Sequence, residues 1–280
     1  MSFLIVSNPE AGSAEEGMAD RALHLLPDAE AFHLEPDADL GRAVDEAVRD
    51  DRVVVAAGGD GTVSACVQHL VGRGTLGVLP AGTRNHLARD LDLNDEEAAL
   101  AALKERRTSR VDLGRLDDRH FINNVALGLY PQLVEKRERD EERIGRWPAM
   151  LRAASRVLRE GEPVVGTIAA DGDARKVGAW MVFVGNNRFL TTPGRIGRRE
   201  RLDEGVLDLR LLLVGTRARL AYSVVRGRTW GPRRVVRREA RRVELRLLQE
   251  GALAVDGEVE EPVRRAEIEI VPRALTLVVP

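Results

Sequence analysis

A glycine-rich turn that carries one carboxylate and one hydroxyl is the segment of the chain best suited to chemistry. It has the sequence Gly58-Gly59-Asp60-Gly61-Thr62 and follows residues 52–57, an apolar, β-branched run with the length of a buried parallel strand. Glycines let the backbone bring exposed N–H groups close to a ligand, and Thr62 can cap the helix that follows. Because Asp60 would repel a bare phosphate, the turn favours a nucleoside triphosphate with its Mg²⁺ ion.

Three other turns carry polar residues of the same kind. Asn8 and Gly12 follow the strand expected at residues 3–6, while Gly82, Thr83 and Asn85 follow the strand expected at residues 75–78. The third turn, Asp256-Gly257-Glu258, lies near the C-terminal end. Open α/β sheets bind ligands at the carboxyl ends of their strands, so the turns should converge on one crevice. Each turn alone could be only a tight bend, and Asp-Gly is also a favoured hairpin pair.

The elements that must position these turns change in kind along the chain. Up to Asp112, strands at 3–6, 29–34, 53–57 and 76–79 alternate with helices at 15–26, 40–49, 63–70 and 96–104. Such alternation predicts a parallel sheet with helices on both faces. Strands then follow one another, at 111–116, 120–126, 163–170, 179–184, 206–214, 242–248, 252–255 and 266–270. The pattern predicts two domains, at residues 1–112 and 113–274.

The order and spacing of six segments resemble the diacylglycerol kinase catalytic-domain family. These bacterial lipid kinases are related to sphingosine kinases and, more remotely, to NAD kinases. The segments are the Asn8-Pro9 turn, residues 58–62, the Pro-x-Gly-Thr-x-Asn of residues 80–85, Phe121 to Gly128, Leu202 to Asp208, and Asp256-Gly257-Glu258. Each segment is short, but together they extend over nearly the whole chain.

The resemblance implies an α/β nucleotide-binding domain with a parallel sheet and a C-terminal, mostly antiparallel β-sandwich domain, with the active site between them. Residues 275–280 would return to the first domain as a closing strand. Asp256 would be the general base and Glu258 its metal-linked neighbour. Nucleotide and metal would be bound by Asn8, Gly12, Gly58, Gly59, Asp60, Gly61, Thr62, Gly82, Thr83 and Asn85. A structural Mg²⁺ would be held at Leu202, Glu204 and Val206, largely through backbone carbonyls.

Two positions depart from the family pattern. The chain continues after Gly12 with Ser13-Ala14-Glu15-Glu16, where relatives often have a lysine or a further glycine, so this turn offers no cation to phosphate. His86 stands where aspartate is common, and it is interpreted as a surface histidine or a residue at a helix N-terminus. The other histidines show no metal-ligand spacing and are interpreted as structural.

The composition excludes several classes of protein. The chain has 280 residues with 44% hydrophobic and 31% charged residues, and it contains no run of eighteen apolar residues that would span a membrane. Cys66 is the only cysteine, which rules out an internal disulfide and a cysteine-based zinc cluster. The first residues lack the features of a signal peptide, so a cytoplasmic setting is expected.

Charge is distributed unevenly although the net charge is only −2. Residues 1–51 carry thirteen Asp or Glu and three Arg, whereas residues 195–246 carry sixteen Arg and six Asp or Glu. A basic face, with an amphipathic helix at residues 146–159 that carries Trp147, would favour peripheral contact with an anionic membrane. The alternatives are that the arginines reflect composition alone and that the helix packs on its own sheet. Nucleic acid is not expected as a partner, and a homodimer is left open.

Other kinase and hydrolase templates are absent: the sequence has no P-loop, no His-Arg-Asp or Asp-Phe-Gly motif, and no Gly-x-Ser-x-Gly elbow. The expected function is an ATP- and Mg²⁺-dependent lipid kinase of phospholipid metabolism, with diacylglycerol as the acceptor. Sphingoid bases, phosphatidylglycerol and polyprenols remain open as acceptors. The alternatives are a kinase of a soluble acceptor, as in NAD kinases, and a nucleotide- or membrane-binding protein without turnover.

Overall fold

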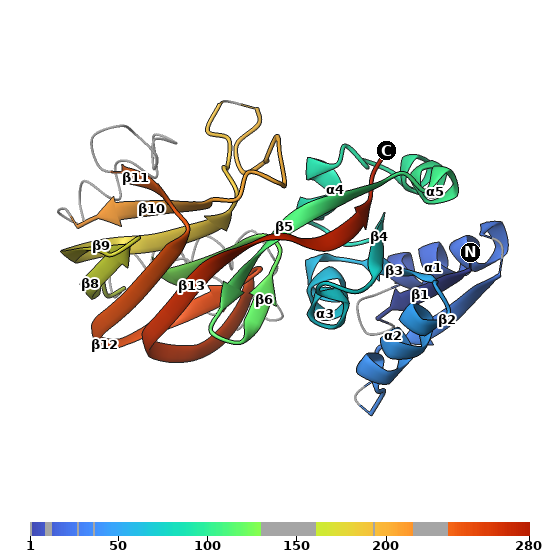
Figure 1. Ribbon diagram of the computed structural model, residues 1–280, viewed down its shortest axis with the longest axis horizontal. Coiled ribbons are helices and arrows are strands. Elements are labelled where there is room, and N and C mark those ends of the chain that lie inside the picture. Colours follow the sequence, from blue (N-terminus) through green and yellow to red (C-terminus); the bar gives the residue numbers. More distant parts are fainter. Residues whose placement is uncertain are drawn as a thin grey trace.

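The apolar runs of the first part of the chain form a parallel sheet with fully buried central strands. A computed structural model of the protein (Figure 1) describes residues 2–8, 13–26, 28–35, 37–129, 161–192, 194–214 and 235–280. In it β3 (Val53–Gly58) lies between β1 (Phe3–Ser7) and β4 (Thr75–Pro80), and β2 (Ala29–His33) pairs with β1. Every residue of β1 and β3 is buried, as expected for strands covered on both faces.

Five helices are described in this first domain: α1 (Ser13–Leu25), α2 (Leu40–Arg49), α3 (Asp60–Leu70), α4 (His86–Asp90) and α5 (Glu96–Glu105). Helix α1 packs on β1, α3 on β3 and α5 on β4, while α2 packs on α3. The short helix α4 was not predicted, because five residues are too few to show a helical period. Together these elements confirm the alternating β/α domain.

The remaining strands form the second, mostly antiparallel domain at the left of Figure 1. They are β5 (Thr108–Leu116), β6 (Arg119–Phe121), β7 (Asn124–Gly128), β8 (Val164–Ala170), β9 (Asp173–Asn186), β10 (Leu207–Leu213), β11 (Val235–Ala240), β12 (Arg242–Val255) and β13 (Glu258–Val278). Four details differ from the sequence-based prediction. The strand expected at 120–126 is divided into β6 and β7, the strands expected at 242–248 and 252–255 are one strand, and the charged strand β11 was missed. The strand expected at 266–270 and the closing strand expected at 275–280 are both parts of β13.

Strands β5 and β13 run through both domains. They pair with each other from Ile268–Leu116 to Val278–Thr108, and the end of β13 pairs in parallel with β4 at Thr276 and Leu277. The last strand therefore extends the N-terminal sheet, and the division predicted at residues 112 and 113 falls inside β5. Leu113 and Leu275 belong to the core of the first domain, whereas Leu116 and Ile268 belong to that of the second.

Two sequence-based predictions lie outside the described residues: the position of Gly12, and the amphipathic helix at 146–159 with its Trp147. Among the residues that are described, no helix has both the length and the apolar character needed to cross a membrane.

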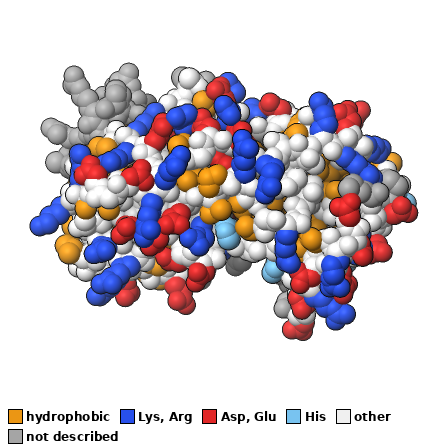
Figure 2. All heavy atoms as spheres, viewed as in Figure 1, with side chains coloured by type: hydrophobic (Ala, Val, Ile, Leu, Met, Phe, Trp, Pro, Cys, Tyr) orange, Lys and Arg blue, Asp and Glu red, His pale blue; other side chains and the backbone are white. Residues whose placement is uncertain are grey.

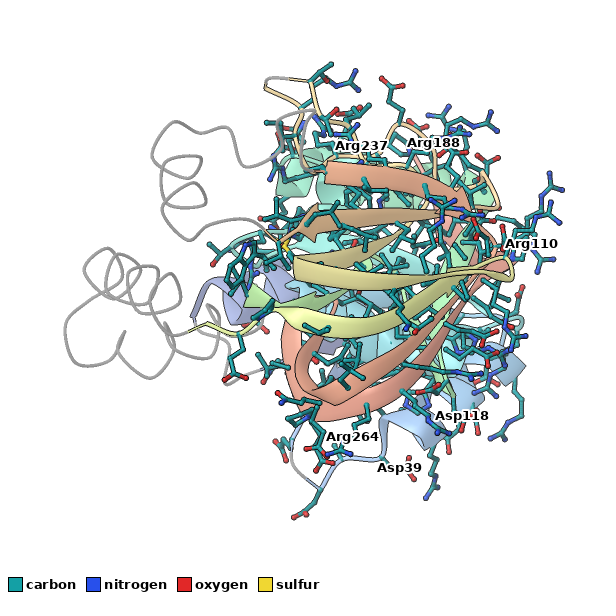
Figure 3. The ribbon with its side chains drawn as sticks, turned by 90° about the vertical axis from the view of Figure 1, so that its left-hand side faces the viewer. Asp39, Arg110, Asp118, Arg188, Arg237 and Arg264 are labelled. Carbon is teal, nitrogen blue, oxygen red and sulfur yellow. The ribbon has the colours of Figure 1, made fainter. Side chains whose placement is uncertain are left out.

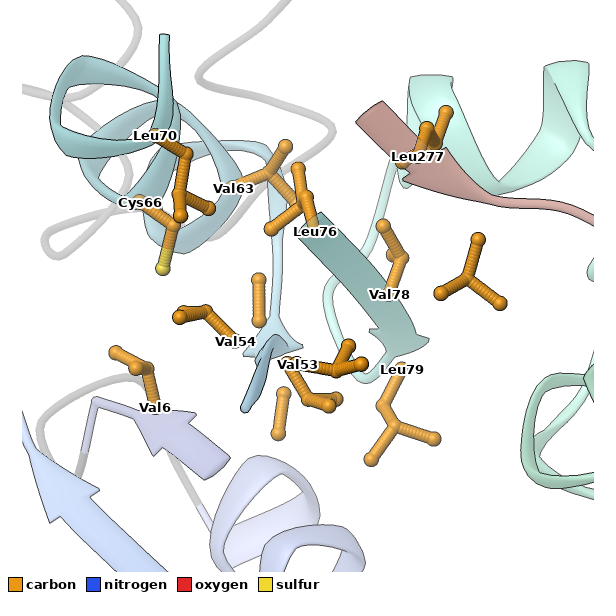
Figure 4. Packing of buried hydrophobic residues seen from close by; sticks show 14 of the residues in the cluster. Val6, Val53, Val54, Val63, Cys66, Leu70, Leu76, Val78, Leu79 and Leu277 are labelled. Atoms are coloured by element: carbon orange, nitrogen blue, oxygen red, sulfur yellow. The ribbon is translucent and has the colours of Figure 1, made fainter. Parts of the chain in front are cut away.

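Cys66 is fully buried in the first core, where Val54, Val63 and Leu70 surround it in the close view of Figure 4. Burial raises the pKa of its thiol to about 12. The native protein should therefore react with a thiol reagent at pH 8 far more slowly than the unfolded chain, which mass spectrometry of the labelled protein would detect.

The same pKa shift predicts a pH dependence of stability. The thiol of the unfolded chain ionises near pH 9 and that of the folded chain only near 12, so its contribution is complete below pH 9 and is lost as the pH rises toward 12. Between pH 8 and pH 10, the stability advantage of the wild type over Cys66→Ala should shrink by on the order of 1 kcal/mol in urea unfolding. An unchanged difference would contradict the raised pKa.

Candidate active site

The glycine-rich turn after β3 becomes the N-terminus of a helix without any intervening loop. Gly59 is the N-cap of α3 and the helix begins at Asp60, so Thr62 lies buried inside the first turn. The prediction that Thr62 caps the helix was therefore wrong, because the helix starts three residues earlier than the apolar pattern indicated. The first N–H groups of a helix have no intrahelical acceptor, so this turn presents donors at the positive end of α3, which suits a phosphate.

The turn after β4 packs directly on this one at a contact between two glycines. A Cβ atom on Gly82 would lie 2.4 Å from the Cα of Gly59, so no side chain fits there. Thr83 is exposed in the same turn. Asn85 caps α4 in a left-handed conformation (φ 45°) and donates from Nδ2 to the Gly82 carbonyl at 2.7 Å. Its Oδ1 is buried and has no hydrogen-bond partner within the described residues, which leaves an acceptor for an N–H or O–H of a nucleotide.

The late Asp-Gly-Glu turn between β12 and β13 reaches both of these turns from the second domain. A Cβ atom on Gly61 would lie 2.8 Å from Oε1 of Glu258, and one on Gly257 would lie 3.4 Å from Nη1 of Arg84. The structure thus brings together three of the four turns that the sequence singled out, those at residues 58–62, 80–85 and 256–258. The carboxylates of Asp60 and Glu258 come from different domains to the start of α3, and Mg²⁺ is commonly held by one or two carboxylates plus substrate phosphates.

Asp256 is held by the segment that separates β6 from β7. Its Oδ1 accepts hydrogen bonds from the backbone N–H groups of Asn123 (2.7 Å) and Asn124 (3.0 Å), and its Oδ2 accepts one from Ile122 (3.0 Å). The residue is only 6% exposed and has a left-handed φ of 50°. Burial raises the pKa of Asp256 above the ordinary carboxyl value, and the three amide donors oppose that rise. The result is an oriented carboxylate with an increased affinity for a proton.

His86 is the first residue of α4, in agreement with its interpretation as a residue at a helix N-terminus, and it also contacts Asp60. Its backbone N–H donates to Oδ1 of Asp60 at 2.9 Å and so fixes the orientation of that carboxylate. Burial lowers the pKa of the imidazole, and the nearby Asp60 opposes this effect. The ring is therefore neutral at pH 7, and it lines a pocket that it shares with Asn124 and Phe189 of the second domain.

The segment predicted to hold a structural Mg²⁺ is tied to its surroundings by protein groups. The carbonyls of Leu202 and Val206 each accept a backbone N–H, the first from Asp112 at 2.7 Å. Glu204 pairs with Arg188 at 2.7 Å. In the part of the chain that the structure describes, no group of three or more His, Cys, Asp or Glu side chains is placed to hold a metal. A Mg²⁺ bound here, mainly by carbonyls, stays a prediction.

The remaining site residues lie at the same edge of the sheet. Asn8 directly follows Ser7, which pairs with Ala57, so it lies beside the start of the glycine-rich turn. Arg84 is a residue that the sequence reasoning missed, and its contact with the Gly257 position places a cation at the crevice. Arg84 stands between Thr83 and Asn85, two residues that the sequence analysis did select, but only the fold shows that this arginine lies near the Asp-Gly-Glu turn.

Comparison with known proteins agrees with this architecture. The family model "Diacylglycerol kinase catalytic domain" matches residues 2–116, and the model "YegS C-terminal NAD kinase beta sandwich-like domain" matches residues 137–279. A diacylglycerol kinase of Staphylococcus aureus (strain bovine RF122 / ET3-1) is 26% identical over 268 residues, which cover 91% of this chain and 85% of the relative.

Two solved structures share the fold. The crystal structure of a diacylglycerol kinase from Bacillus anthracis has a TM-score of 0.73 at 24% identity and covers 100% of this chain and 96% of its own. An NAD kinase from Archaeoglobus fulgidus in complex with ATP has a TM-score of 0.54 at 13% identity, covering 99% and 93%. The protein is therefore a kinase of the diacylglycerol kinase catalytic-domain family, with a C-terminal domain of the YegS and NAD kinase type.

Proposed function

We propose that this protein is an ATP- and Mg²⁺-dependent lipid kinase that phosphorylates the hydroxyl of diacylglycerol to give phosphatidic acid. The observation that carries the proposal is a mostly apolar pocket of about 210 Å³ that is lined by Asn124, whose backbone N–H binds Asp256. The pocket is lined by His86, Asn124, Ala126, Met181, Phe183, Phe189, Thr191, Ile196, Gly197 and Arg210. A cavity with mostly apolar walls and a few polar groups suits an acyl chain that ends in a hydroxyl-bearing head.

Asn124 joins this pocket to the reacting groups. It lines the cavity, and its backbone N–H binds Oδ1 of Asp256. His86 lines the cavity on the side of the nucleotide domain, where it holds Asp60. A larger cavity of about 400 Å³ at Gly128, Val164 and Leu248 is lined neither by His86 nor by Asn124, which contact Asp60 and Asp256, so the smaller pocket is the better acceptor site.

The arrangement suits an in-line transfer. The amides at the start of α3 bind the phosphates of ATP, and Arg84 adds positive charge. Asp256 accepts the proton of the lipid hydroxyl as its oxygen attacks the γ-phosphorus, and the bond to ADP breaks. Asp60 and Glu258 would hold a Mg²⁺ ion, which would supply charge neutralisation. Most of the acceleration comes from positioning and electrostatics, because a loose transition state requires little covalent chemistry of the protein.

The proposal is tested by following the label from γ-labelled ATP in separate assays with diacylglycerol, phosphatidylglycerol, a sphingoid base and NAD⁺. We expect label in the organic phase with diacylglycerol. Label only in a water-soluble product would indicate a kinase of a soluble acceptor. Binding of ATP without any transfer would indicate a protein that has lost turnover.

We also propose peripheral contact with an anionic membrane on the cytoplasmic side. Ile196 at the pocket is 59% exposed. Arg195 next to it is exposed but pairs with Glu200 at 2.9 Å, and many other arginines are also paired with carboxylates. Basic and acidic side chains are interspersed on the face in Figure 2, and Arg188 and Arg264 lie at opposite rims of the β domain in Figure 3. The apolar residue at the pocket is therefore expected to contribute more than a broad basic face.

Sedimentation with vesicles should show stronger binding to anionic than to neutral lipid, with a decrease at high salt. Ile196→Ser should weaken binding to both vesicle types. The matched control is Leu248→Ser, since Leu248 is 73% exposed but lines the other cavity. Equal loss in the two variants, or binding that ignores lipid charge and salt, would leave the pocket without a membrane role.

A further inference from the structure

A fully buried arginine links the two domains beside the proposed general base. The side chain of Arg199 has 0% exposure, and its Nε lies 2.6 Å from Oδ2 of Asp90, which is itself only 2% exposed. The backbone N–H of Arg199 also donates to Oδ1 of Asp90 at 2.8 Å. Asp90 is the last residue of α4, so this pair joins the nucleotide domain to the loop before β10. Burying both charges costs hydration, which the hydrogen bonds must offset.

The remaining donors of Arg199 bind the segment between β6 and β7 and the last residue of β9. Nη1 donates to the carbonyls of Ile122 (2.6 Å) and Asn186 (3.2 Å), and Nη2 donates to Oδ1 of Asn123 (2.9 Å). The Ile122 carbonyl also accepts from Nδ2 of Asn186 at 2.9 Å, so two donors fix this peptide from one side. The guanidinium also lies over the ring of Phe189, with 5.2 Å to the centroid, and Phe189 lines the acceptor pocket.

This segment is the one whose amides bind Asp256. The carbonyl of Ile122 and the side-chain oxygen of Asn123 accept hydrogen bonds from Arg199. The backbone N–H groups of the same two residues donate to Asp256. A planar guanidinium donates hydrogen bonds in fixed directions, so it can orient the peptide groups of Ile122 and Asn123. The compact ammonium group of a lysine cannot do this.

We propose that Arg199, oriented by Asp90, is a positioning residue for phosphoryl transfer. It holds the peptides of Ile122 and Asn123 so that their amides aim the Asp256 carboxylate toward the acceptor hydroxyl. Through its pair with Asp90, Arg199 also fixes the Asp256 carboxylate relative to α4. This helix begins with His86, whose backbone N–H binds Asp60. The inference rests on the proposed function, in which Asp256 is the base.

The chain offers a matched control in the neighbouring residue. Arg198 also links this loop to the α4 region, through the Arg89 carbonyl and Asp92 (2.5 Å), and these hydrogen bonds do not involve the Ile122–Asn124 segment. Arg198→Ala thus removes a link between the domains and leaves the aim of Asp256 intact. Arg199→Lys keeps the positive charge but removes the planar guanidinium with its several N–H donors in fixed directions. A double variant, Asp90→Leu with Arg199→Met, removes both charges together, so that no unpaired charge is left buried if the single variant fails to fold.

The experiment measures kcat, KM for both substrates, the ATP dissociation constant and the melting temperature for each variant. For Arg199→Lys and the double variant we expect kcat to fall on the order of 10²-fold, because small misplacement of a reacting group has that effect, with ATP affinity unchanged. Arg198→Ala should keep the wild-type kcat. A folded Arg199→Lys or double variant with wild-type kcat, or an equal loss in Arg198→Ala, would overturn the proposal.

Amide hydrogen exchange gives a readout that does not depend on transfer. The amides of Ile122, Asn123 and Asn124 should lose protection in Arg199→Lys and keep it in Arg198→Ala. If the wild-type protein transfers no phosphate to any acceptor, the proposed function fails, and exchange alone decides whether Arg199 holds this segment. Unchanged protection in Arg199→Lys would then overturn the inference.

Discussion

Asp256→Asn should lower kcat by about 10²–10⁴-fold, which is the usual contribution of a general base. The affinity for ATP should change little. Asparagine keeps the shape of the side chain but cannot accept the proton of the lipid hydroxyl. In the proposed site the nucleotide binds on the other side, at the start of α3 and the turn that contains Asn85, so its dissociation constant should be preserved. Initial rates and ATP titrations on the same preparation measure the two quantities separately.

Loss of an amide contact could also lower activity, because both oxygens of Asp256 accept backbone N–H groups. The control is Asp171→Asn. Asp171 also has a left-handed φ, of 49°, and its Oδ1 accepts the N–H groups of Arg241 and Arg242 at 2.9 Å, in a turn outside the site. It should lose stability of about 1 kcal/mol and no activity. A fully active Asp256→Asn enzyme would mean that the late Asp-Gly-Glu is only a turn.

Gly82→Ala is expected to have the second large effect, on the nucleotide side. The new Cβ would lie 2.4 Å from the Cα of Gly59, and backbone cannot yield as the end of a flexible side chain can. The two phosphate-binding turns must therefore separate. We expect kcat/KM for ATP to fall on the order of 10²-fold, the consequence of a displacement near 1 Å.

The matched control for this change is Gly17→Ala in α1, where the new Cβ would make only an ordinary contact of 3.4 Å with the end of the Arg21 side chain. That variant should bind ATP normally and be slightly more stable, because alanine favours a helix over glycine. Calorimetric ATP titration and melting curves distinguish the two variants. Normal ATP affinity in a folded Gly82→Ala protein would remove the glycine contact from the site.

Much of the fold followed from local patterns in the sequence. The β-branched run at residues 53–57 became a fully buried strand, and its neighbours alternate with helices as predicted. The shift to consecutive strands predicted the second domain. The turns with Asp60 and Gly82 were singled out by their glycines and polar residues after predicted strands, because a sharp turn close to a ligand restricts which residues fit. The role expected for the Asp256 turn came from the family resemblance.

Helix boundaries and strand divisions were less accessible from the sequence. The apolar period of α3 starts at Val63, but the helix starts at Asp60, because its first turn is fixed by the packing of Gly59 against Gly82 rather than by apolar side chains. Similarly, nothing local divides residues 120–126. The division into β6 and β7 occurs where Ile122 and Asn123 turn their amides to Asp256.

By itself the sequence determined which residue types can do the chemistry, and the order of the elements that carry them. Only the tertiary structure decided which residues these side chains bind through hydrogen bonds and ion pairs. Asp256 and the Asn123 amide are 133 residues apart, and Arg199 and Asp90 are 109 apart. His86 is an undistinguished histidine in the sequence, and in the fold its backbone binds Asp60 while the residue lines the apolar pocket. The physical reason is that turns and amphipathic patterns depend on neighbours along the chain, whereas hydrogen bonds to buried carboxylates depend on which distant segments the cores bring into contact.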